Sequence, residues 1–208
     1  MKVSDVGRVV AIAGAAAVLP VVALAPQPQG RGETVAGLVD SARRSGLTGW
    51  ELVDHATTLV RDSFDHYSAW HLWEKAERAL SHGRGSSPQV NAVLDAVLRR
   101  LEFSVEIVHA SRVRWEPIRP GVNPWWHTGH VWLRVTHDSE TREVCAIGAG
   151  NRAGQVNFHP LTEVLPVHAW TLPAVRLGLL PFVTGQVWRQ LLFGDDVPLW
   201  LYRDFDRR

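Results

Sequence analysis

Apolar residues return at helical spacing in the first half of the chain. Between Trp50 and Asp62 they recur every three or four positions, with polar residues between them. This period predicts one helix behind the start Thr48-Gly49, because residues three and four apart share one face of an α-helix. A shorter helix is predicted over residues 72–80.

The clearest predicted helix begins at the serine pair Ser86-Ser87. Serine is a common helix cap, Pro88 suits a first turn, and Gln89 stands three positions after Ser86, as in a capping box. One continuous apolar face follows, formed by Val90, Val93, Leu94, Val97, Leu98 and Leu101. The sequence therefore predicts a long, buried helix in the centre of the chain.

After this helix the pattern changes to alternating and β-branched residues. Three predicted strands cover Phe103–Val113, His130–Val135 and Glu143–Ile147, and the polar run His137–Thr141 predicts a hairpin turn. Helices come first and neighbouring strands follow, which is typical of an α+β fold rather than of alternating βαβ units. We therefore expect the central helix to pack on an antiparallel sheet.

Composition places the chain among globular proteins. Of its 208 residues, 46% are hydrophobic and 21% are charged, which excludes disorder for most of the length. The 22 Lys and Arg against 21 Asp and Glu give a net charge of +1 without a basic block, so no nucleic acid is expected as a partner. The single cysteine, Cys145, excludes an internal disulfide and a metal site built from cysteines alone.

Residues 1–33 are predicted to form an apolar leader and a linker. Residues 9–26 carry no charge and follow two basic residues, which is typical both of a membrane anchor and of a signal peptide. Ala23-Leu24-Ala25 has the form of a cleavage site, but Pro26 directly after it disfavours cleavage. We expect membrane association through residues 9–26, with secretion as the alternative.

Residues 170–208 are predicted to form a C-terminal extension with an apolar helix. The stretch from Trp170 to Trp188 contains Arg176 and Pro181, which argues against a solitary transmembrane helix. Two placements stay open: packing on the domain, or lying at a membrane interface with a tryptophan at each end. The folded domain itself is then expected over residues 34–169.

A glycine-rich turn, Gly83-Arg84-Gly85, stands directly before the serine pair of the central helix. A His-x-Trp strand follows about forty residues later as His130-Val131-Trp132, and Glu143-Val144-Cys145-Ala146 lies on the next predicted strand. In this order the motifs, over about residues 46–165, resemble the transglutaminase-like superfamily, and most of all bacterial transglutaminase-domain proteins. The resemblance implies a papain-like core with a nucleophilic cysteine at the helix start, a histidine on the strand and an aspartate on the neighbouring strand.

The chain departs from the family pattern at two of these three positions. Ser87 stands at the position of the nucleophilic cysteine, and the acid position falls near Cys145 or Ala146, with Glu143 the closest carboxylate. The resemblance then implies Ser87 as nucleophile, His130 as general base and Glu143 as the acid that orients the imidazole. A serine hydroxyl is much harder to ionise than a thiol, so such a site needs a well-oriented base. Losing the orienting carboxylate in a serine enzyme lowers kcat by about 10⁴.

Two functions follow from these substitutions, and the sequence leaves both open. In the first, the domain transfers or hydrolyses acyl groups on protein or peptide amides; Glu143 shares a strand face with Cys145 and so can face His130. In the second, the domain is a pseudoenzyme that keeps the papain-like cleft for binding or as a scaffold. Structural roles are also open: Ser86-Ser87 as a helix cap, His130 as a satisfied core histidine, and Cys145 as a small buried side chain. Neither function requires a cofactor or a metal ion.

Four further patterns along the chain bear on these functions. The run Gly148–Gly154 is followed by a short extended segment instead of a helix, which argues against a dinucleotide-binding turn. The stretch Val144–Asn151 is also similar to the segment after the acid in arylamine N-acetyltransferases, which share the papain-like core. The histidines around His127–His130 show no ligand pair at helical spacing, so no metal site is expected. Trp125-Trp126 predicts an aromatic loop that either walls the cleft or docks onto a membrane or the C-terminal helix.

Overall fold

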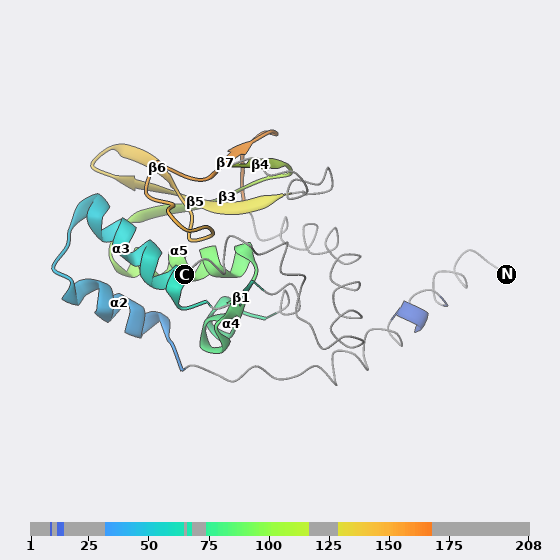
Figure 1. The fold of residues 1–208 in the computed structure, drawn as a ribbon, viewed down its shortest axis with the longest axis horizontal. Coiled ribbons are helices and arrows are strands. Elements are labelled where there is room, and N and C mark those ends of the chain that lie inside the picture. The colour runs from blue at the N-terminus through green and yellow to red at the C-terminus, as the bar shows by residue number, and fades with distance from the viewer. Residues whose placement is uncertain are drawn as a thin grey trace.

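The computed structural model describes residues 9, 12–14, 32–64, 66–67, 74–116 and 129–167 (Figure 1). In this part of the chain the helices are α2 (Val35–Arg44), α3 (Gly49–Asp62), α4 (Ala76–His82) and α5 (Ser87–Arg100). The strands are β1 (His66–Tyr67), β2 (Arg84–Gly85), β3 (Ser104–Ala110), β4 (Val113–Trp115), β5 (His130–His137), β6 (Glu140–Val144), β7 (Phe158–Pro160) and β8 (Leu165–Pro166).

The strands form one main sheet and two short pairs. β6, β5, β3 and β8 make a four-stranded sheet in that order, and each neighbouring pair in it is antiparallel. β4 and β7 pair as a separate antiparallel ribbon, and β1 pairs with β2 in parallel. Figure 1 shows α2, α3 and α5 below the sheet, with the β4–β7 ribbon on its upper side. The α+β fold, with a central helix against an antiparallel sheet, is therefore confirmed.

α5 is the centre of the core, and its apolar face is buried from Val90 to Leu98. It packs against the other helices of the described domain and against β3 and β5. Five of its apolar side chains have no exposed surface: Val90, Val93, Leu94, Val97 and Leu98. The capping box predicted from Ser86 and Gln89 is present at its start. The local signals for this helix were therefore sufficient to place it.

The hairpin between β5 and β6 is tighter than the predicted turn His137–Thr141. The two strands run into that segment and leave only Asp138 and Ser139 as the turn. Both turn residues have positive φ, 50° and 65°, as a type I′ turn requires. β6 consequently begins and ends three residues earlier than the predicted strand Glu143–Ile147, so that prediction is wrong in its limits.

Directly after α5, a residue other than glycine has a left-handed backbone conformation. Glu102, directly after the C-cap Leu101, has a φ of 72°, where glycine is the usual residue after a helix. A Cβ atom costs roughly 1 kcal/mol in this conformation. Glu102→Gly is therefore expected to raise the free energy of unfolding by about 0.5–1 kcal/mol in a urea titration. Glu102→Ala removes the carboxylate but keeps the Cβ, and an equal gain from both variants would contradict the backbone explanation.

The predicted leader and C-terminal extension fall largely outside the described residues. Of residues 9–26, only 9 and 12–14 are described; residues 168–208 and Trp125-Trp126 are not. Within the described ranges, no helix combines the length and the apolar character needed to cross a bilayer. Membrane association and the domain limits 34–169 therefore stay predictions.

Candidate functional site

The local structure requires glycine at both glycine positions of the turn before α5. Gly83 ends α4 in the left-handed conformation, with a φ of 66°. At Gly85 a Cβ atom would lie 3.0 Å from the ring of Phe64, so glycine lets this ring pack closely on the turn. The turn therefore fixes where α5 begins, and with it the position of Ser87.

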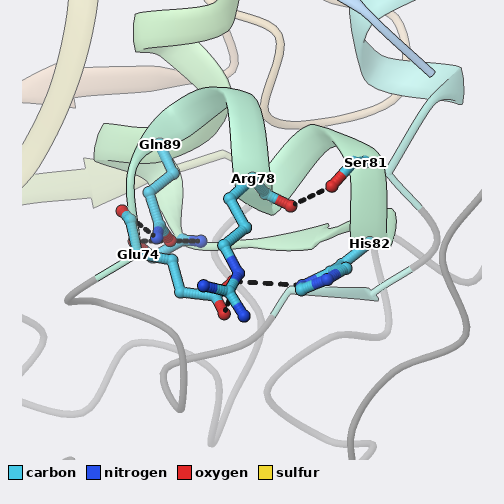
Figure 2. A network of polar contacts seen from close by, with 6 residues as sticks. Glu74, Arg78, Ser81, His82 and Gln89 are labelled. Atoms are coloured by element: carbon cyan, nitrogen blue, oxygen red, sulfur yellow. Dashed lines mark hydrogen bonds and ion pairs between the residues drawn. The ribbon is translucent and has the colours of Figure 1, made fainter. Parts of the chain in front are cut away.

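Side chains around α4 hold the start of α5 in place (Figure 2). Gln89 Oε1 accepts hydrogen bonds from the backbone N–H and the hydroxyl of Ser86, and Gln89 Nε2 donates to the carbonyl of Glu74 at 3.0 Å. The Glu74 carboxylate in turn lies 3.3 Å from Nδ1 of His82 and 3.5 Å from Nε of Arg78. The segment before α4 is thereby tied to the capping box of α5. Sequence reasoning did not single out Glu74 or His82, because neither residue belongs to a motif and their contact depends on how the chain turns around α4.

Ser87 is the first residue of α5 and is largely buried, with 7% of its surface exposed. The N-cap of the helix is Ser86, so the cap does not require a hydroxyl at Ser87. Within the described residues, no hydrogen bond joins the Ser87 hydroxyl to His130 or to Glu143. The role of Ser87 as nucleophile stays a prediction.

His130 begins β5 and lies in a box of aromatic rings. The ring centroids of Trp115 and Phe158 lie 4.7 and 4.6 Å from that of the imidazole, edge to face, and Trp132 stacks on it at 5.8 Å. Nε2 of His130 lies 3.2 Å from Sγ of Cys145. Only 3% of the surface of His130 is exposed. The imidazole is thus a core side chain whose hydrogen-bond partner is a thiol.

Burial keeps both members of this His130–Cys145 pair uncharged at neutral pH. Desolvation lowers the pKa of His130 to about 3 and raises the pKa of Cys145 to about 12. The backbone N–H of Ile147 and the amide of Asn91 donate to Sγ at 3.3 and 3.6 Å, and these contacts offset only part of the rise in the thiol pKa. The pair is therefore the reverse of a reactive cysteine–histidine pair, in which a thiolate faces an imidazolium.

Glu143 lies further along the sheet than His130 and contacts other side chains. The hairpin register places Glu143 opposite Arg134. Its carboxylate accepts a hydrogen bond from Nε of Arg134 at 3.0 Å and a second one from the indole N–H of Trp132. In the described part of the chain no contact joins Glu143 to His130, and Cys145 occupies the place beside the imidazole. No contact therefore supports the role of orienting acid for Glu143.

Asn91, one helical turn after Ser87, joins the parts of the site. In the hairpin register Val131 would lie opposite Ala146, but β6 ends before this pair. The amide of Asn91 lies between the two backbones: Nδ2 donates to the carbonyl of Val131 at 2.8 Å, and Oδ1 accepts from the N–H of Ala146 at 3.1 Å. Sequence reasoning missed this role. The available signal was a polar amide within the apolar face of a helix, since a buried amide needs hydrogen-bond partners.

The chemistry available to this cluster is limited. It holds an imidazole, a thiol and an amide in neutral hydrogen bonds, and no carboxylate of the described residues contacts the imidazole. Among the described residues, no group of three His, Cys, Asp or Glu side chains could hold a metal ion. The geometry therefore provides a buried, uncharged centre, and the described residues form no oriented acid–base pair in it.

The comparisons with known proteins place few limits on this interpretation. No protein-family model matches the chain, and no curated protein sequence matches it. Among solved structures, the crystal structure of a TGase is similar to it, with a TM-score of 0.43 and 12% sequence identity. The similarity covers 59% of this chain and 33% of that one, so the chain spans about a third of the length of the TGase. Likeness at this level does not show the family.

Proposed function

We propose that the chain is a transglutaminase-like domain without acyl-transfer activity, which serves as a binding or scaffold domain. The observation that carries this proposal is the neutral pair of His130 and Cys145, 3.2 Å apart and fully enclosed. A general base must accept a proton near neutral pH, and an imidazole with a pKa of about 3 is a very weak base. The position of the nucleophile holds the hydroxyl of Ser87, which needs a stronger base than a thiol does.

The order of the elements supports the transglutaminase-like ancestry in this proposal. The glycine-rich turn leads directly into α5, Ser87 is the first residue of that helix, and His130 begins a strand that packs on it. Cys145, beside the imidazole, stands where the family pattern has its acid. All three catalytic positions of the pattern thus have a counterpart, and two of them hold a residue poorly suited to the catalytic step.

A protein with a single thiol at the start of α5 tests the proposal. Ser87→Cys combined with Cys145→Ser leaves one cysteine, because the natural chain has no other. The alkylation rate by iodoacetamide is measured across the neutral and alkaline range, and its midpoint reports the thiol pKa. Because His130 is neutral, we expect the same midpoint after the further change His130→Phe, which keeps a ring in the aromatic box.

An active arrangement gives a different result in this experiment. If His130 forms an ion pair with the new thiolate, removing the imidazole raises the midpoint by about 1 unit or more, and the proposal is wrong. The natural protein is the blank, since its only cysteine, Cys145, is fully buried. Its slow alkylation is expected at every pH in this range.

A further inference from the structure

A short aromatic ribbon covers His130. β4 and β7 pair over three residues each and do not belong to the four-stranded sheet. Trp115 on β4 and Phe158 on β7 place their rings edge-on to the imidazole. Phe158 also contacts Trp132 on β5, at a centroid distance of 5.0 Å. The ribbon is thereby attached to the sheet through the same rings that exclude water from His130.

Two features weaken the pairing of this ribbon relative to the sheet beneath it, although Phe158 is buried in the core. A two-stranded ribbon is marginally stable by itself, whereas β5 is paired on both sides. Directly before β7, Oδ1 of Asn157 is buried without a hydrogen-bond partner, so closing the ribbon removes its hydration without replacing it. Opening the ribbon breaks the three residue pairs between β4 and β7 and the ring packing on His130, but no pairing of the four-stranded sheet.

We infer that the β4–β7 ribbon is a proton-sensitive cover that opens over His130 and Cys145 in mildly acidic solution. In the closed form only the neutral imidazole fits the aromatic box, because a charged ring there would lose its hydration. In the open form the ring meets water and binds a proton with an ordinary pKa of 6.5, against about 3 when covered. The stability that His130 gives the closed form is therefore complete above pH 6.5 and is lost as the pH falls toward 3.

The groups that face the imidazole from the sheet and from α5 do not reverse this loss of stability in acid. Cys145 stays a neutral thiol throughout the acidic range, and the contribution of α5 to the cluster is the uncharged amide of Asn91. On β3 the residue opposite His130 is Ala110. The Glu143 carboxylate, on the neighbouring strand, is held by side chains of β5 other than His130.

The charged groups on the outer face of the ribbon weakly favour the closed form. Nε2 of His159 lies 3.2 Å from the carboxylate of Glu116, and Arg114 lies 4.0 Å from the same carboxylate. A positive charge on His159 strengthens this cluster and so favours the closed ribbon. All three side chains are about half exposed, and exposed ion pairs contribute little.

Labelling of Cys145 reports the opening, because it is the only cysteine and lies 3.2 Å from His130. The probe is dithiodipyridine, which reacts with thiols in acid, and each rate is divided by the rate for glutathione at the same pH. From pH 7.5 to pH 5 we expect this relative rate to rise about 30-fold, the ratio that pKa values of 6.5 and about 3 imply. The far-UV circular dichroism is expected to stay native at both pH values.

Three variants separate this proposal from other causes. His130→Phe keeps a ring in the box but binds no proton, so the pH dependence is expected to disappear, whereas His159→Gln is expected to retain it. Trp115→Ala removes one wall of the cover and is expected to increase the relative rate already at neutral pH. An unchanged relative rate in acid, a pH dependence that survives in His130→Phe, or a loss of circular dichroism in parallel with labelling would each overturn the proposal.

Discussion

Cys145→Asp is expected to raise the pKa of His130 from about 3 by roughly 1–3 units or more. An aspartate at this position lies beside Nε2 of the imidazole, and its negative charge favours the protonated ring. The carboxylate finds hydrogen-bond donors in place, since the N–H of Ile147 and the amide of Asn91 already point at this position. A pH titration of the imidazole by proton–nitrogen NMR measures the change.

Cys145→Asn is the matched control for this change. Asparagine has the shape of aspartate but no charge, so the pKa of His130 is expected to stay near 3. If the pKa of His130 rises equally in both variants, loosened packing around the ring is the cause, and the explanation by charge is wrong. A rise in Cys145→Asp alone would show that one residue at position 145 decides whether His130 can act as a base.

Asn91→Ala is expected to cause the largest loss of stability among these substitutions. It removes the partners of two buried backbone groups, the carbonyl of Val131 and the N–H of Ala146. Each buried group without a partner costs about 1–3 kcal/mol, so the loss of both partners is expected to lower the free energy of unfolding by about 2–6 kcal/mol. A urea titration followed by tryptophan fluorescence measures this loss.

Asp95→Asn, on the same helix, is the comparison for a contact outside the site. Asp95 pairs with Arg99 at 2.7 Å, but burial raises the pKa of Asp95 in spite of that partner. The pair therefore adds little, and its removal is expected to change the free energy of unfolding by no more than about 0.5 kcal/mol. Similar losses from Asn91→Ala and Asp95→Asn would contradict the bridging role of Asn91.

The main elements could be predicted from the sequence because their signals are local. The capping box of Ser86 and Gln89 and the apolar face behind it place α5 without reference to the rest of the chain. The hairpin was harder to place, because Asp138-Ser139 lacks the glycine that marks most type I′ turns. The polar residues on both sides of it resemble a longer turn, so the limits of β6 were misplaced.

The contacts of the candidate site could not be predicted in the same way, because they depend on register. The two-residue turn sets Glu143 opposite Arg134 and leaves Cys145 as the neighbour of His130. The aromatic cover also joins distant segments, since Trp115 and Phe158 meet only through the pairing of β4 with β7. The residue types indicated which side chains belong to a site. The alignment of the strands decides which of these side chains contact one another.

The protonation state of His130 in the natural protein decides whether this residue can serve as a base. Proton–nitrogen NMR distinguishes neutral from protonated imidazole, and comparison with His130→Phe assigns this ring among the ten histidines. We expect a neutral ring at neutral pH, with no titration near the ordinary pKa of 6.5. A titration midpoint at or above that value would contradict it, because His130 would then be able to serve as a general base.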